Sequence, residues 1–147
     1  AAEWITTHVR GGKEIAEETL SLVADFTLIW ALFEGTEAHG EDVVVVVVDE
    51  LQSIAERVSH EFSDQRLDEF LAFWSNRYIE DRSTNQRFNQ LNLTHEPHRT
   101  LVDDVLLENE NNCVNRIHAI LLITYRLRNN IFTALKTSSI WMNKRTT

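Results

Sequence analysis

The chain is poor in the residues that form cross-links and tight turns. Its 147 residues include 1 cysteine, 1 proline and 4 glycines. A lone Cys113 excludes an intramolecular disulfide, and the scarcity of glycine and proline argues against an all-β fold with many tight turns. Cysteine and histidine have no zinc-site spacing, and no phosphate-binding glycine motif occurs. We therefore expect neither a metal nor another cofactor.

Long apolar runs and secretion signals are also lacking. Residues 1–14 have no basic start followed by an apolar core, and no apolar run approaches the length that spans a bilayer. The sequence predicts a cytoplasmic protein without a membrane segment. The 43% of hydrophobic and 25% of charged residues are ordinary for a soluble protein, and the length favours one domain, residues 1–147.

The charge of the chain is divided unevenly. The net charge is −9, and all 23 acidic residues lie at or before Glu110. Residues 111–147 contain 6 basic residues and no acidic one. The overall charge opposes non-specific binding of nucleic acid, although the basic segment can still provide a local phosphate site. The alternative, which charge alone favours, is that this segment pairs with the acidic remainder of the fold.

The hydrophobic pattern is helical almost throughout. Residues 42–60 are predicted to form a second helix, because their apolar residues continue a helical face despite six consecutive valines, 43–48, which have strand propensity. A first long helix is expected to end at Gly35 and to bury one stripe: Ile15, Thr19, Leu22, Val23, Phe26, Ile29, Trp30 and Phe33.

Further helices are expected along the rest of the chain. The pattern predicts an all-α fold, a bundle of about four long helices plus short helices. One helix is expected from Ser63 or Asp64 to about Asp81, with a buried face formed by Leu67, Phe70, Leu71, Trp74 and Tyr78. A short helix is expected in 84–91, and Pro97 is expected in the opening turn of the next helix. The last helix is expected to be capped by Asn111 or Asn112 and to run from Cys113 to about Lys136, followed by a tail, 137–147, that is either flexible or the start of a truncated helix.

Arg128 stands out on the last helix. It lies in the middle of an apolar face, where a guanidinium needs an acid, carbonyl groups or a wet cleft. Asn129 and Asn130 follow it, although Asn is a poor residue inside a helix. Such local conflicts often mark functional sites. The alternative is a structural Arg128 held by an acid such as Asp103 or Asp104.

The string from Tyr125 to Phe132, YRLRNNIF, resembles the signature of HEPN-domain proteins. The similarity extends to Leu135-Lys136 and, upstream, to the segments 73–78 and 101–106. The resemblance implies a helical bundle, usually a homodimer. Many members are metal-independent ribonucleases that act as toxins or in defence against phage. Others are non-catalytic partners of nucleotidyltransferase-like antitoxins.

The family's catalytic motif is an arginine, a polar residue, three further residues and a histidine. Arg128 and Asn129 match its first two positions, whereas Thr133 stands where the histidine belongs. Cleaving RNA without a metal requires proton transfer near neutral pH, which imidazole performs and a threonine hydroxyl does not. The resemblance implies a ribonuclease scaffold whose present chain is inactive. By the same resemblance, the expected substrate-binding residues are Asn130, Arg126 and Lys136.

Two other readings compete with the ribonuclease scaffold. One is a non-enzymatic module whose last helix binds a nucleotidyltransferase-like antitoxin or its own copy. The other is a scaffolding bundle in which Arg128 is purely structural. Convergence of two Arg128 side chains across a two-fold axis would favour a ribonuclease. An Arg128 that is paired inside one subunit would favour the structural role.

Histidines outside the motif have simpler interpretations. A metal site at His95, Glu96 and His98 is conceivable, but Pro97 spoils the helical spacing and a solvated loop is favoured. We expect His118 to be a flanking or interface residue of the last helix.

Overall fold

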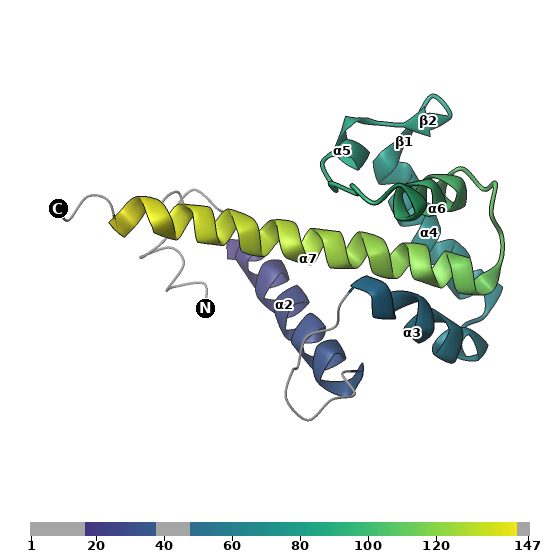
Figure 1. The fold of residues 1–147 in the computed structure, drawn as a ribbon, viewed down its shortest axis with the longest axis horizontal. Coiled ribbons are helices and arrows are strands. Elements are labelled where there is room, and N and C mark those ends of the chain that lie inside the picture. The colour runs from purple at the N-terminus through teal and green to yellow at the C-terminus, as the bar shows by residue number, and fades with distance from the viewer. Residues whose placement is uncertain (1–16, 38–47, 144–147) are drawn as a thin grey trace. The chain divides into compact units, whose positions relative to one another are not determined.

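The computed structural model describes residues 17–37 and 48–143 (Figure 1). These residues are mostly helical and contain one pair of two-residue strands, so the prediction of an all-α fold is confirmed. The chain divides into two compact units: residues 1–45 together with 128–147, and residues 46–127. The interpretation of residues 1–147 as one domain stays a prediction.

The first unit contains helix α2, Glu17–Glu37, and the end of helix α7, Cys113–Asn143. In α2, Leu20 and Trp30 are buried, whereas Leu22 and Ile29 are exposed. The predicted single stripe is therefore wrong at Thr19, Leu22 and Ile29, and its first member, Ile15, lies outside the described residues. Apolar side chains of α2 occur on both its buried and its exposed sides, so their spacing does not indicate which face is buried. Gly35 lies inside α2 instead of ending it.

The second unit contains the remaining described elements and the first part of α7. Val48 is the first described residue after the gap, and the other five valines of the run lie outside the described residues. The elements are η2 (Val48–Glu50), α3 (Leu51–Val58), η3 (Ser59–Glu61), α4 (Asp64–Tyr78), β1 (Ile79–Glu80), β2 (Ser83–Thr84), α5 (Gln86–Asn89) and α6 (Glu96–Leu106).

Polar caps fix where these helices begin. Ser63 Oγ accepts a hydrogen bond from the Arg66 amide at the start of α4. At the start of α7, Asn112 Oδ1 accepts from the amides of Val114 and Asn115. Pro97 lies in the first turn of α6. The predicted roles of Ser63, Asn112 and Pro97 are confirmed.

Two predicted helix ends are wrong. Helix α4 ends at Tyr78 instead of Asp81, because the chain turns there into the β1–β2 hairpin. Helix α7 continues to Asn143 instead of ending near Lys136, so residues 137–143 extend the last helix. The expected short helix in 84–91 is present as α5.

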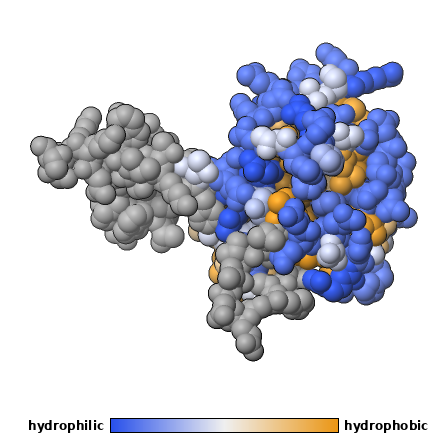
Figure 2. Space-filling model, in the orientation of Figure 1, coloured by the Kyte–Doolittle hydropathy of each residue, from blue (hydrophilic) through white to orange (hydrophobic). Residues whose placement is uncertain are grey.

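The core of the second unit is apolar and includes buried residues from each of its described α-helices. Ala55, Leu67 and Ile117 bring α3, α4 and α7 into one cluster. Phe70 of α4 was predicted to be buried, but it is exposed, as is Phe73. Figure 2 shows a mostly hydrophilic face with apolar residues visible between the polar ones. The fully buried residues of this core include Leu51, Tyr78, Phe88, Leu91, Val102, Leu122 and Ile123.

Helix α2 has one further property. Its segment Glu18–Thr36 is long enough and apolar enough to cross a membrane, the one such case among the described helices. The prediction that no segment reaches that length is therefore wrong. The core helix of a soluble protein passes the same test, so length and composition alone are weak evidence for a membrane.

Candidate functional site

Arg128 is paired inside its own unit. Its Nη2 lies 3.3 Å from Oε1 of Glu34 on α2, and its Nη1 donates a 3.0 Å hydrogen bond to Asn129 Oδ1. Both side chains are largely shielded, with 23% of Arg128 and 9% of Glu34 exposed. The expected partners Asp103 and Asp104 were wrong, because Glu34 provides the carboxylate.

This pairing sets what Arg128 can do chemically. A shielded guanidinium beside a shielded carboxylate has its charge already compensated. An incoming phosphate would have to displace Glu34, leaving that carboxylate buried without its cation. The arrangement is the one expected for a structural arginine within one chain.

The other predicted site residues on α7 differ in their exposure. Asn129 and Asn130 are half-buried on α7, and Thr133 is exposed. The side chain of Lys136 lies outside the described residues. The structure thus brings together Arg128 and Asn129 of the predicted site, together with Glu34, which the sequence analysis missed.

A signal for Glu34 was present in the sequence. At 100° per residue, Glu34 falls on the same arc of α2 as Leu20, Val23 and Trp30. An acid on one apolar helix face and a base on another are together the expected signature of a buried ion pair. The sequence shows each of these helix faces separately, but no local pattern indicates that the two faces contact each other.

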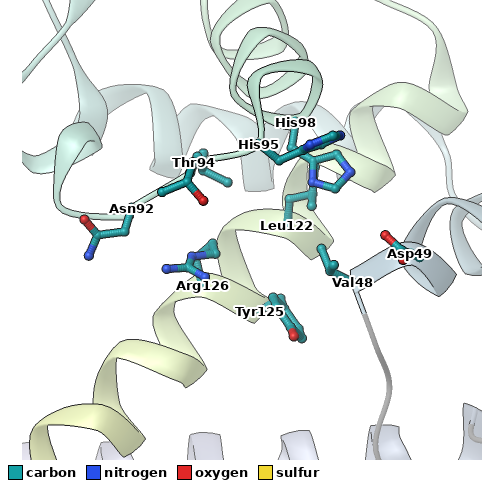
Figure 3. A pocket seen from close by; sticks show the side chains of 10 residues that line it. Val48, Asp49, Asn92, Thr94, His95, His98, Leu122, Tyr125 and Arg126 are labelled. Carbon is teal, nitrogen blue, oxygen red and sulfur yellow. The ribbon is translucent and has the colours of Figure 1, made fainter.

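Arg126 has a different set of neighbours and belongs to the unit 46–127. Its Nε donates a 2.8 Å hydrogen bond to the backbone carbonyl of Leu91. It borders a cavity of about 300 Å³, which we name the Arg126 cavity. Its polar lining, shown in Figure 3, includes Asp49, Asn92, Thr94, His95, His98 and Tyr125.

Three histidines meet beside this cavity. The His98 ring centroid lies 4.4 Å from that of His95 and 5.8 Å from that of His118. Burial, and secondarily His95, lowers the pKa of His98, while Asp49 partly opposes the shift. Burial, and secondarily His98, lowers the pKa of His118, with Glu56 opposing. Both imidazoles are therefore held neutral at pH 7.

These positions change two sequence-based interpretations. His118 is buried in the second unit, so its expected place at a flank or interface is wrong. His98 lies within α6 and borders a cavity, whereas a solvated loop was expected. Across residues 17–37 and 48–143, no three His, Cys, Asp or Glu side chains are grouped to hold a metal ion.

Comparison with protein-family models, curated proteins and solved structures gave no match for this chain. The HEPN resemblance therefore stands on the sequence motif alone and stays a prediction.

Proposed function

We propose that this chain is a HEPN-type ribonuclease scaffold that does not itself cleave RNA. The observation that carries the proposal is the state of the motif. Thr133 occupies the position of the acid–base histidine, and Arg128 is already paired with Glu34. One group required for proton transfer is missing, and the group that would meet the phosphate is engaged.

The two defects act on different steps of the reaction. Without an imidazole, neither the 2′-hydroxyl nor the 5′-oxygen of the leaving group exchanges its proton efficiently, which typically costs about 100-fold to 10,000-fold in rate. With Glu34 beside it, Arg128 is less able to stabilise charge that develops on the phosphate. Restoring the histidine alone should therefore recover only part of the activity.

The test is cleavage of single-stranded RNA in the presence of excess chelator. The parent chain should be inactive, and Thr133→His should gain weak metal-independent cleavage. Adding Glu34→Gln to Thr133→His should increase cleavage further, because the substitution releases the Arg128 guanidinium. The matched control adds Glu69→Gln, which removes an exposed acid from α4 and should change nothing.

Further variants identify the groups responsible. Arg128→Ala in the Thr133→His background should abolish the gain. Strong cleavage by the parent chain would overturn the proposal, since another residue would then be the base. No cleavage by the Thr133→His, Glu34→Gln double variant, with its helical circular dichroism intact, would remove the ribonuclease interpretation.

A second candidate function is a non-catalytic scaffolding or binding module, which two observations favour. The first is the intrachain pair between Arg128 and Glu34, which favours a scaffold in which Arg128 is structural. The second is an exposed apolar arc on α2, spanning about 120° at 100° per residue. We name this surface the α2 arc; its members are Leu22, Leu28, Ile29 and Leu32, which are 61–68% exposed.

The chemistry of the α2 arc favours a protein as its occupant. The exposed carboxylate of Asp25 lies within the arc by helical geometry. An aspartate near the centre of a membrane-spanning helix costs about 2.5–3.5 kcal/mol, so lipid is a poor neighbour. A protein partner can instead place a cation opposite Asp25. A second copy of the chain offers one in its segment 111–147, which has no acid. Three of its six basic residues are arginines with partners of their own, and the other three are Lys136, Lys144 and Arg145.

The remaining expectations are parts of the same proposal. Cytoplasmic localisation is proposed from the composition of the chain, with its single cysteine. A homodimer, an RNA substrate and a nucleotidyltransferase-like antitoxin follow from the HEPN resemblance. In the homodimer, α7 lies at or near the interface and supplies the basic segment for the α2 arc of the other copy.

A further inference from the structure

The Arg126 cavity lies wholly within the unit 46–127, whereas Arg128, Asn129 and Thr133 belong to the other unit. Of the residues expected in the ribonuclease site, only Arg126 lines the cavity. Its volume of about 300 Å³ is at the lower end of the range of small-molecule pockets. It therefore fits one small ligand or a single nucleotide. Residues from η2, α6, α7 and the segment before α6 contribute to its walls.

One end of the cavity is suited to an anion. The hydrogen bond from Arg126 Nε to the Leu91 carbonyl fixes the plane of the guanidinium. Its Nη groups form no ion pair with any carboxylate of the described residues. An oriented guanidinium presents paired donors that match phosphate oxygens. Figure 3 shows the side chains of Asn92 and Thr94 beside Arg126, where they add polar groups at the same end.

The other end of the cavity has the opposite polarity. In Figure 3, Asp49 lies across the cavity from Arg126, next to Val48. A carboxylate accepts hydrogen bonds and repels phosphate, so this end is suited to a donor such as an amino group. The neutral ring of His98 lies above, and adds no charge to oppose such a donor.

Between the two ends, the cavity has an aromatic wall. Tyr125 of α7 is half-buried and provides it, whereas Leu93 and Leu122 of the lining are buried. Flat bases stack on an aromatic side chain whatever the identity of the base. The order across the cavity is thus an anion site, a surface for a flat ring, and an acceptor for an amino group.

We propose that the Arg126 cavity binds a nucleoside monophosphate whose base carries an exocyclic amino group, with the phosphate at Arg126 and the amino group at Asp49. Cytidine monophosphate is the favoured ligand, because a cavity of about 300 Å³ favours the smaller pyrimidine base. One arginine is matched to a single phosphate rather than to a di- or triphosphate. The proposal is independent of the ribonuclease interpretation, since the free nucleotide is the ligand.

The experiment is titration of the parent chain with four probes: cytidine monophosphate, uridine monophosphate, cytidine and inorganic phosphate. Calorimetry gives the affinities, and amide chemical shifts of Tyr125 and His98 locate the site. Cytidine monophosphate should bind most tightly. Cytidine should lose most of the affinity because it lacks the phosphate, and uridine monophosphate should bind more weakly because a carbonyl replaces the amino group facing Asp49.

Three variants then assign the contacts. Arg126→Gln should weaken binding of cytidine monophosphate by about 10-fold to 100-fold, the range for a charge-assisted hydrogen bond. Asp49→Asn should reduce the preference for cytidine over uridine monophosphate while leaving phosphate binding intact. The control Arg82→Gln removes the same charge from the exposed hairpin turn and should leave affinity unchanged. Thermal unfolding of each variant shows that the fold is retained.

Two results would overturn the proposal. The first is no binding of cytidine monophosphate by the folded parent chain at millimolar concentration. The second is equal binding of inorganic phosphate and cytidine monophosphate, which would leave only a general anion site. RNA cleavage by any variant would test the proposed function and would leave this conclusion unaffected.

Discussion

Arg116 and Arg128 show how single buried charges are accommodated in different ways. Arg116 is only 8% exposed at its side chain, and its partners Asp64 and Asp68 are on the exposed surface of α4. Arg128 instead pairs with a Glu34 that is itself buried. Water screens the first arrangement on its acidic side, whereas the second depends on both partners being present.

The buried imidazole of His118 gives a prediction about pH and stability. Its pKa is lowered from 6.5 in the folded state, mainly by burial, so the unfolded chain binds more protons just below that pH. Stability is therefore fully present above 6.5 and is lost as the pH falls. His98 and Glu56 are the titratable groups that face His118, and His98, also lowered, acts in the same direction.

The measurement is the thermal unfolding midpoint from neutral pH to below 6.5. The parent chain should lose stability on acidification, and His118→Gln should lose less. His60→Gln is the matched control, because His60 is exposed on η3 and should keep the parent's pH dependence. Identical pH profiles for the parent and His118→Gln would show that His118 does not carry the effect.

At the scale of an element, the β1–β2 hairpin shows a local backbone constraint. The two strands are joined by Asp81 and Arg82, whose φ angles are 50° and 60°. Two central residues with positive φ are typical of a type I′ turn, which favours Asn-Gly. Asp tolerates this conformation, whereas Arg does not favour it. Because the sequence lacks the usual Asn-Gly signal, the hairpin was missed and α4 was extended to Asp81.

Arg82→Gly is therefore expected to stabilise the protein by about 0.5–1 kcal/mol, since relief of the left-handed conformation exceeds the added entropy of the unfolded chain. Urea denaturation would detect it as a higher midpoint with an unchanged slope. Arg87→Gly on α5 is the control and should destabilise, because glycine is unfavourable within a helix. A midpoint that does not rise in Arg82→Gly would contradict the argument.

Helix α2 shows the limits of hydrophobic periodicity within an element. Its apolar residues occupy two arcs, one buried with Leu20 and Trp30 and one exposed with Leu22 and Ile29. A periodic pattern shows that a helix forms, but two apolar arcs leave the buried face undetermined. In α2, Trp30 and Glu34 lie on the buried arc, one helical turn apart.

At the scale of the whole molecule, the exposed apolar residues of the α2 arc predict self-association. We expect a homodimer at micromolar concentration, and Leu22→Gln with Ile29→Gln should shift it toward monomer because both substitutions fall on the arc. Sedimentation velocity measures the change. Phe73→Gln is the control, since Phe73 is exposed on α4 in the other unit. A parent chain that is monomeric would contradict the homodimer and favour a different protein partner.

The charge distribution adds a second test of the same dimer. An interface in which Asp25 meets basic residues of another copy is weakened by salt. Asp25→Lys should therefore reduce association and its salt dependence together, because like charges would then face each other. An association that strengthens in Asp25→Lys would show that the basic segment is not the partner of the α2 arc.

The sequence by itself determined the features that depend on neighbouring residues. Ser63, Asn112 and Pro97 mark helix starts because a cap or a first-turn proline satisfies local backbone geometry. The helical class followed from the 3.6-residue period and the scarcity of turn residues. The conflict at Arg128 was also visible locally, as a charge on an apolar face.

The tertiary structure alone decided which distant groups meet. Glu34 rather than Asp103 or Asp104 pairs with Arg128, and no local pattern distinguishes these three acids. Likewise, Asp49, His98 and Arg126 come from three separate elements, so the Arg126 cavity has no signature in the sequence. Packing brings together residues remote along the chain, and the period of a helix records which residues share a face but not what that face contacts.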